Sequence, residues 1–378
     1  MEAAFRIGDR GAPVTQIAEL LGRLGLLSGE PPDEFDHRME LAVRTFQQQR
    51  GLSVDGVVGP STFRRLDEAR WALGDRILTH LPGNLMAGDD VFALQQRLLS
   101  LGFNLGRVDG YFGTRTEAAL RDFQVNFGIP SDGTCGPATL KALSGLSPIV
   151  SGGAPNALRA QERIRAAGPQ LAGKVVVLDP ARGHNFPAEF ATASDEIVQD
   201  IARRVEGRLA ATGVHAYLSA PRWAGAGGEE EDRAAFANRT NAHLSISLAL
   251  DTSSNPGACG VATYFFGSDN HGTWSSTGER LAGLVHREIV ARTDLQDLRC
   301  HAKTWDFLRR TRMPAIRVDV GYLTNHGDTR RLRDPGFRDV VAEAVAVAVQ
   351  RFYLSPESDA GTGFLRFSEL QAGPIQRS

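Results

Sequence analysis

The feature that most constrains the fold is an internal repeat in the first 145 residues. The stretch 43–66, VRTFQQQRGLSVDGVVGPSTFRRL, aligns with 120–143, LRDFQVNFGIPSDGTCGPATLKAL, at a constant offset of 77 residues. The same offset relates 14–25 to 91–102 upstream. A repeat of this kind predicts two copies of one small structure in tandem rather than one continuous core.

Each copy has the sequence pattern of three short helices. The first helix of the second copy has apolar residues at helical spacing and is followed by Gly102, where a left-handed C-terminal residue belongs. The second helix ends before Gly51 in one copy and before Gly128 in the other. An Asp-Gly turn and a third helix that begins behind a proline follow. We therefore predict two all-α three-helix modules, at 1–75 and 76–148.

The remainder of this multidomain chain has a different pattern. Residues 149–173 begin as a Gly-Pro-containing linker and end in a short charged helix. From 174 to 354, apolar strand-like runs alternate with amphipathic segments, the first helix being predicted at 195–213. This alternation predicts an α/β domain with a mostly parallel sheet, whose ligands bind at the carboxyl ends of the strands. The final stretch, 355–378, is polar and is predicted to be a flexible tail.

Composition excludes several function classes. The net charge of −2 at pH 7 gives no electrostatic reason to expect nucleic acid as a partner. No run reaches the roughly 18 apolar residues of a membrane span, and the first residues lack the basic and apolar regions of a secretory signal. The 3 cysteines form no CxxC pair, so neither a disulfide framework nor a thiolate zinc site is indicated. We therefore expect a cytoplasmic protein without a transmembrane segment.

Both repeats share Phe-Gln, a Gly followed by Leu or Ile, Asp-Gly and Gly-Pro at the same spacing. This motif resembles the peptidoglycan-binding domain that occurs in tandem beside bacterial cell-wall hydrolases. The resemblance implies muropeptides or peptidoglycan precursors as ligands. Phe46, Leu52 and their equivalents fit core and turn positions, so we interpret the motif residues as structural.

The α/β region carries a second series of motifs in a fixed order. They are LDP at 178–180, Arg233 with Ala237 and Asn238, SISLALD at 245–251, GVATYFF at 260–266 and MPAIRVDVGYLTN at 313–325. The series resembles the zinc-dependent N-acetylmuramoyl-L-alanine amidases of the AmiC/CwlV type, whose motifs read LDPGHGG, SIHAN and PAvLvElGFlsN. In that family a His, a Glu and a second His hold the zinc, and a later Glu deprotonates the zinc-bound water.

Aligned with these motifs, the chain lacks all three expected zinc ligands. Arg182 stands at the first His, Ser194 at or near the Glu, and Ala249 at the second His, while Asp319 replaces the Glu that acts as the base. A guanidinium has no lone pair to donate and alanine offers no ligand atom. The resemblance therefore implies a degenerate, inactive site without a metal. We expect Arg182 and Asp319 to form an ion pair across the vacated pocket or else to face solvent.

A shifted zinc site is the alternative. It would use His184, two residues beyond the expected position, together with Glu189, Glu196 or His243. His184 fits a solvated loop better, and His243 precedes its strand and is expected near the opposite end of the sheet. Under this alternative the chain would be a zinc-dependent peptidoglycan hydrolase with a non-standard metal site.

The combination of two binding modules, a degenerate amidase domain and a short tail is most similar to the actinobacterial CwlM group. The resemblance implies a cytoplasmic regulator of peptidoglycan precursor synthesis, which could also lie at the inner face of the plasma membrane. It would bind and activate UDP-N-acetylglucosamine enolpyruvyl transferase under the control of a Ser/Thr protein kinase. The tail offers Thr362 and Ser368 as phosphorylation sites.

Overall fold

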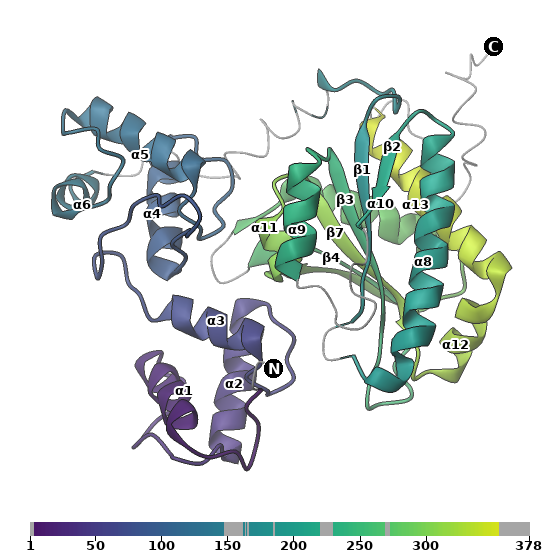
Figure 1. Ribbon diagram of the computed structural model, residues 1–378, viewed down its shortest axis with the longest axis horizontal. Helices are drawn as coiled ribbons and strands as arrows, with labels where there is room; N and C mark the ends of the chain where they lie inside the picture. The colour runs from purple at the N-terminus through teal and green to yellow at the C-terminus, as the bar shows by residue number, and fades with distance from the viewer. Residues whose placement is uncertain are drawn as a thin grey trace. The chain divides into compact units, whose positions relative to one another are not determined.

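The computed structural model describes residues 4–146, 162, 164, 166–183, 186–219, 230–268 and 273–354 (Figure 1). The chain forms two units, Met1–Asn156 and Ala157–Ser378. The first unit is helical and the second is an α/β structure built on a mostly parallel sheet. The predicted fold class is confirmed for both units.

The helical unit contains the two repeats found in the sequence. Its helices are α1 (Ala12–Arg23), α2 (His37–Arg50), α3 (Pro60–Ala69), α4 (Asp89–Ser100), α5 (Thr114–Phe127) and α6 (Pro137–Ser144). One hydrophobic cluster is formed by residues between 14 and 69 and a second by residues between 78 and 143. We refer to the first three helices as module 1 and to the other three as module 2.

The helix ends agree with the sequence signals. Gly51 and Gly128 take the left-handed conformation at the ends of α2 and α5, with φ of 66° and 77°. Pro60 and Pro137 begin α3 and α6, where a missing N–H costs nothing. The glycine of the Asp-Gly turn is required for a second reason: a Cβ on Gly56, at φ +75°, would lie 2.8 Å from the Glu40 side chain.

A buried glutamine ties each Asp-Gly turn to its neighbouring helices. In module 1, Nε2 of Gln47 donates to Oδ1 of Asp55 at 2.6 Å, to the carbonyl oxygen of Val57 at 3.0 Å and to Oγ1 of Thr62 at 3.1 Å. Its Oε1 accepts from the backbone N–H of Gly56 at 2.9 Å. One amide group therefore satisfies polar groups that the turn would otherwise bury without partners.

Module 2 contains this network twice. Gln124 bonds Asp132 and Thr139 at 2.8 and 3.1 Å, and Gln95 bonds Asp109 and Thr116 at 2.9 and 3.0 Å. The first half of module 1 has no counterpart, because Ala18 and Met39 stand 77 residues before Gln95 and Thr116. Both of these side chains are buried in the apolar core of module 1.

The α/β unit alternates strands and helices. Its elements are β1 (Val175–Pro180), α8 (Ala188–Ala210), β2 (His215–Leu218), α9 (Glu230–Arg239), β3 (Leu244–Asp251), β4 (Val261–Ser268), β5 (Thr273–Trp274), α10 (Ser276–Arg292), β6 (Asp297–Lys303), α11 (Asp306–Arg310), β7 (Ala315–Tyr322), α12 (His326–Arg333) and α13 (Pro335–Tyr353). The strands form a seven-stranded sheet in the order β2-β1-β3-β7-β4-β5, with β6 also paired to β4. Strands β2, β1, β3 and β7 are parallel, and β4 runs antiparallel to β7.

The two faces of the sheet are covered by different helices (Figure 1). Helices α8, α10 and α13 pack on one face through a large cluster of aliphatic side chains. Helices α9 and α11 lie on the other face, which we call the α9 face, and pack there on a small aromatic cluster around Trp305 and Phe307. Alternation along β1, β3 and β7 directs Asp179, Ser247 and Arg317 to the α9 face.

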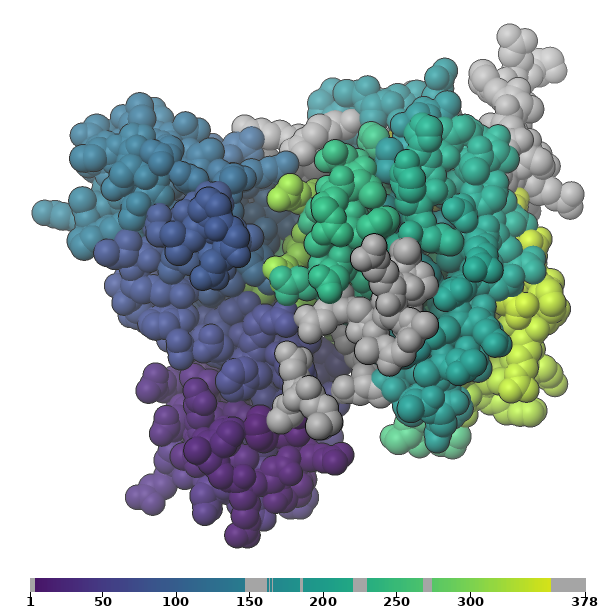
Figure 2. Space-filling view, viewed as in Figure 1, coloured from purple at the N-terminus to yellow at the C-terminus, as the bar shows by residue number. Residues whose placement is uncertain are grey.

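Helix α8 begins at Ala188, seven residues before the start predicted from the sequence. The stretch AEFATAS has good helix formers and follows Pro187, which lies at the N-cap. Ser194 and Asp195 are therefore part of this helix. On the outer surface α8 and α13 lie side by side, drawn in teal and yellow in Figure 2, and Arg208 of α8 pairs with Asp339 of α13 at 2.7 Å.

Across the residues that the structure describes, none of the helices has the length and apolar character needed to cross a membrane.

Candidate functional site

Polar residues from four strands form one row across the α9 face of the sheet. Asp179 of β1 is in register with Ser247 of β3, Ser247 with Arg317 of β7, and Arg317 with Tyr264 of β4. Residues in register on neighbouring strands point to the same face. The described structure thus places an acid, a hydroxyl, a guanidinium and a phenol side by side beneath α9 and α11.

The next row towards the carboxyl edge contains two of the four positions predicted from the sequence. Ala249 of β3 is in register with Asp319 of β7, and Asp319 with Ala262 of β4. Ala249 is fully buried and Asp319 is 3% exposed. The structure therefore brings the position aligned with the second zinc ligand next to the position aligned with the general base.

The loop after β1 contains the first-ligand position, Arg182, which contacts the residue that follows Ser194 on α8. Arg182 donates from Nε to Oδ1 of Asp195 at 2.8 Å and from Nη2 to Oδ2 at 2.5 Å, so the first-ligand position meets the second turn of α8. This hydrogen bond to Asp195 raises the pKa of Arg182. The loop also lies against the end of β3, since a Cβ on Gly183 would be 2.9 Å from the carbonyl oxygen of Leu250.

The expected ion pair between Arg182 and Asp319 is wrong. Arg182 pairs with Asp195 and is half-buried, whereas Asp319 accepts a 2.7 Å hydrogen bond from Nε of Arg317. Asp319 pairs with Arg317 rather than with Arg182 because residues 317 and 319 lie two apart on the same face of one strand. Asp319 does not face solvent, so the simpler expectation for this residue is also wrong.

The side chains at the three ligand positions do not fit a zinc ion. Arg182 offers only N–H donors, and its Nε and Nη2 are bonded to Asp195. Ser194 is fully buried, and its hydroxyl has no hydrogen-bond partner among the described residues. Ala249 has a methyl group there. Zinc sites in enzymes use three nitrogen, sulfur or carboxylate ligands, and none stands at these positions.

Arg317 is the central charged group of the site. It is 3% exposed, and its guanidinium carbon lies 5.0 Å from the centroid of the Trp305 ring. Burial alone would lower the pKa of Arg317, but the adjacent charge of Asp319, followed by Glu230 and Asp251, raises it above its ordinary value. The guanidinium is thus held charged between a carboxylate and an aromatic face.

A second buried ion pair lies at the β1 end of the row. Asp179 is fully buried, and its two oxygens accept from Nη1 of Arg233 at 2.7 Å and from Oγ of Ser219 at 2.5 Å. Arg233 comes from α9 and lies over the Phe307 ring, 5.7 Å from its centroid. The motif residues Asp179 and Arg233, far apart in the sequence, therefore form one structural contact.

Asp251 lies at the end of β3 beside these charges. Burial raises the pKa of its carboxyl group to about 6, and the negative charge of Asp319 adds to the rise. The N–H of Thr252 and the charge of Arg317 act in the opposite direction. Burial and the charge of Asp319 together raise this pKa more than the N–H of Thr252 and the charge of Arg317 lower it.

The residues of the shifted zinc site are only partly described. His184 lies outside the described residues, while Glu189 and Glu196 are exposed on α8. His243 accepts from the N–H of Val175 at 3.0 Å, at the amino end of β1 and far from the carboxyl edge, as expected. In the described ranges no group of three His, Cys, Asp or Glu side chains could hold a metal ion. Thr362 and Ser368 also lie outside the described residues.

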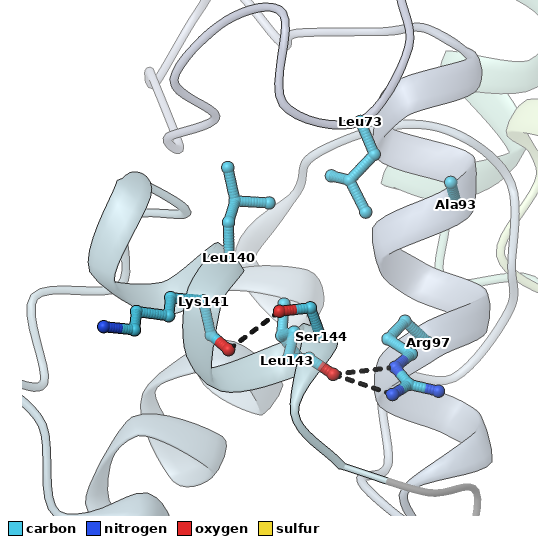
Figure 3. A pocket seen from close by; sticks show the side chains of 7 residues that line it. All are labelled: Leu73, Ala93, Arg97, Leu140, Lys141, Leu143 and Ser144. Carbon is cyan, nitrogen blue, oxygen red and sulfur yellow. Dashed lines mark hydrogen bonds between the residues drawn. The ribbon is translucent and has the colours of Figure 1, made fainter.

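Module 2 contains a separate hollow of about 600 Å³ (Figure 3). It is lined by Leu73, Ala93, Arg97, Leu140, Lys141, Leu143 and Ser144. Figure 3 shows Leu73, Ala93 and Leu140 facing one another across it, while the Lys141 ammonium points away. Arg97 donates to the carbonyl oxygen of Leu143 at 2.7 Å and fixes α6 against α4. The walls that remain available to a ligand are mainly apolar.

Sequence reasoning named four positions of the site but missed two charged residues beside them. Arg317 lies inside the motif that contains Asp319, and Asp251 is the last residue of the strand that contains Ala249. A signal was present: an arginine in the middle of the apolar run AIRVDV is rare in a central strand and indicates a buried partner. The pairing of Asp179 with Arg233 had no signal in the local sequence.

Comparison with known proteins gives two family matches. A model described as N-acetylmuramoyl-L-alanine amidase matches residues 176–351, and one described as a peptidoglycan binding domain matches 10–66 and 87–143. The protein named N-acetylmuramoyl-L-alanine amidase CwlM, of Mycobacterium tuberculosis, is 44% identical over 385 aligned residues, which cover 98% of this chain and 94% of that protein.

Other similarities cover parts of the chain. A spore cortex-lytic enzyme of Bacillus cereus is 51% identical over 57 residues, which are 15% of this chain and 22% of that protein. Among solved structures, the N-acetylmuramoyl-L-alanine amidase AmiC2 of Nostoc punctiforme is 26% identical, with a TM-score of 0.40 over 48% of this chain and 98% of that one.

Proposed function

Because the chain belongs to the N-acetylmuramoyl-L-alanine amidase family that includes CwlM of Mycobacterium tuberculosis, we propose that it is a non-catalytic member that regulates peptidoglycan precursor synthesis. The chemistry of the ligand positions carries this proposal. A guanidinium, a buried hydroxyl and a methyl group stand where a zinc amidase needs three ligands. Without zinc, no water is activated for attack on the amide bond.

The proposed partner is UDP-N-acetylglucosamine enolpyruvyl transferase, which the chain binds and activates in the cytoplasm or at the inner face of the plasma membrane. A Ser/Thr protein kinase controls the interaction through the tail. The support for this part is the resemblance to the CwlM group together with the tail sequence GTGFLRFSEL, which combines an apolar segment with acceptors at Thr362 and Ser368. A phosphate added there would provide charge and hydrogen-bond acceptors for a partner.

Metal analysis of the purified chain tests the loss of catalysis. We expect no stoichiometric zinc, and a melting temperature that a chelator leaves unchanged. A native-state ligand present at 100 times its Kd would add about 2.7 kcal/mol of stability, which a melting curve would reveal. Zinc near one equivalent, lost together with stability on chelation, would show that the site is active in metal binding.

Calorimetric titration against the enolpyruvyl transferase tests the partner. The phosphorylated chain should bind more tightly than the unphosphorylated chain, and Thr362→Ala with Ser368→Ala should remove the difference. A Ser131→Ala variant, altered at an exposed position of the helical unit outside the hollow of module 2, is the matched control. Identical heats for all forms would refute control through these two residues.

The alternative function is a zinc-dependent N-acetylmuramoyl-L-alanine amidase with a non-standard metal site at His184. It is favoured by the family to which the chain belongs and by the name of its Mycobacterium tuberculosis relative. Incubation of the zinc-supplemented chain with purified peptidoglycan decides between the two. Release of peptides with a free L-alanine amino group, abolished by His184→Ala, would establish the alternative.

The helical modules are proposed to bind muropeptides or peptidoglycan precursors, and the hollow of module 2 is the candidate site. Its apolar walls suit the methyl groups of a short peptide stem. Module 1 has Phe63 and Gln16 at the positions of Leu140 and Ala93. Leu140→Phe should therefore fill the hollow and weaken muropeptide binding in an NMR titration, whereas the reciprocal Phe63→Leu in module 1 should leave this binding unchanged. Equal affinities of parent and Leu140→Phe would move the site elsewhere.

A further inference from the structure

The position of Arg317 is unusual for an arginine. It lies on β7, which has β3 on one side and β4 on the other, so that the side chain starts from the interior of the sheet. Its side chain is 4% exposed, as is that of Asp319, and the two form a 2.7 Å hydrogen-bonded pair. The cost of bringing both charges out of water is recovered only if the pair and its surroundings are well organised.

The surroundings of the guanidinium meet this condition. The Trp305 ring lies 5.0 Å from the guanidinium carbon, and the Tyr264 ring packs 4.6 Å from the Trp305 ring. Tyr264 is also in register with Arg317 on the neighbouring strand. An arginine cannot be neutralised by losing its proton within the range of protein conditions, so the positive charge is permanent.

Three carboxylate side chains interact electrostatically with Arg317. Asp319 is in direct contact, while Glu230 at the start of α9 and Asp251 at the end of β3 also stabilise the charged form of Arg317. The other arginines at this edge are already bonded, Arg233 to Asp179 and Arg182 to Asp195. The acids that remain around the zinc-ligand positions thus have Arg317 as their central positive charge.

We propose that Arg317 is the permanent internal cation of the α9 face and supplies beside Asp319 the positive charge that a metal ion would otherwise supply. The inference rests on the proposed function, in which the α/β unit works without zinc. It adds that Asp319 already has a positively charged partner in the unaltered chain. Restoring ligand atoms is then not sufficient for zinc binding, because Zn²⁺ would enter beside a fixed like charge.

A zinc titration of the full-length chain tests the proposal. The ligand-restored variant carries Arg182→His, Ser194→Glu and Ala249→His, and is compared with the same variant that also carries Arg317→Met. We expect zinc to bind at least tenfold more tightly after the additional Arg317→Met change, measured by competition with a chromophoric chelator. Equal zinc affinities of the two variants would overturn the proposal.

Arg351 provides a matched control. It is another buried arginine of the α/β unit, paired with Glu288 between α13 and α10, which cover the opposite face of the sheet from Arg317. Arg351→Met in the ligand-restored variant should leave the zinc affinity unchanged. A gain equal to that of Arg317→Met would show a general loosening of the unit and would also overturn the proposal.

If neither ligand-restored variant binds zinc, a double-mutant cycle of unfolding constants tests the proposal. The unfolding constants of Arg317→Met, Asp319→Asn and the double variant are measured without metal. The double variant should unfold at least tenfold less than the product of the single effects predicts, and should fold even where Arg317→Met alone does not. Strictly multiplicative effects, or a double variant that also fails to fold, would refute the pairing. Stoichiometric zinc in the unaltered chain would instead defeat the proposed function.

Discussion

The helical unit and the α/β unit both bury polar side chains, but they do so in different patterns. In the helical unit a neutral glutamine network occurs three times, at Gln47, Gln95 and Gln124, each time beside an Asp-Gly turn. In the α/β unit two charged pairs, centred on Asp179 and Arg317, lie in one row on the α9 face. Other buried ion pairs occur in both units, such as Arg65 with Glu68 and Arg351 with Glu288. The repeated network belongs to the architecture of the turn, whereas the two pairs of the row belong to a particular site.

The strongest test of this contrast removes one partner of a buried pair. Asp179→Ala leaves Arg233 buried with no carboxylate at Asp179, and we expect the free energy of unfolding of the α/β unit to fall by about 3 to 5 kcal/mol. Hydrogen exchange of α/β peptides measures the change, with the helical peptides as an internal reference. The double variant Asp179→Leu with Arg233→Met should recover most of the loss. No recovery would mean that Asp179 acts through contacts other than this pair.

The crowding of acids at the carboxyl edge predicts a pH effect of intermediate size. The folded pKa of Asp251 is about 6, above its ordinary value of 3.8, so the folded chain holds this proton more tightly than the unfolded chain. Stability should therefore decrease as the pH rises from about 4 to about 6, by up to about 3 kcal/mol. Unfolding of parent and Asp251→Asn is compared across this range. A decrease of equal size in the variant would assign the effect to another group.

Substitution of the network glutamines tests the same comparison in the helical unit. Gln124→Leu should lower the stability of module 2 by about 2 kcal/mol, because the turn at Asp132 and the hydroxyl of Thr139 lose a buried partner. Gln47→Leu should have a similar effect in module 1. Thermal unfolding of the two variants gives the values. A cost in one module only would contradict a shared architectural role.

The smallest effect is expected at the edge ion pair. The side chains of Arg182 and Asp195 are 27% and 24% exposed, so their pairing is weakened by solvent. Arg182→Ala should change the free energy of unfolding by less than about 1 kcal/mol. Denaturant unfolding with Arg310→Ala as a second surface-pair control measures this. A loss as large as that of Asp179→Ala would remove the distinction between the edge and the interior of the site.

Most of the fold could be predicted because each element has a strong local signal. The repeat offset and the glycine and proline positions predicted the helices of both modules, and apolar runs predicted β1, β3, β4 and β7. Strand β6 was missed, since its sequence DLRCHAK mixes charged and apolar residues on a strand whose side chains are alternately exposed. Helix α11 was missed because it has five residues, too few for a periodic pattern.

The site was predictable in position but not in its contacts. The motif alignment named Ala249 and Asp319 but did not predict that they are neighbours, which the register of β3 and β7 shows. It could not show that Asp319 pairs with Arg317 or that Arg182 pairs with Asp195. Such choices depend on which side chains share a face and on where α8 begins, and both are settled by packing over distances that a motif does not cover.

The sharing of α5 between two glutamine networks has a consequence for cooperativity. Thr116 near its start belongs to the network of Gln95, and Gln124 near its end forms the next one, so neither half of module 2 can open without breaking a bond to the other. In module 1 the corresponding helix α2 forms a network only through Gln47, and Met39 meets α1 through apolar contact alone. Under mechanical force or protease digestion, module 2 should therefore unfold in one step. In module 1, α1 should detach before α2 and α3 unfold.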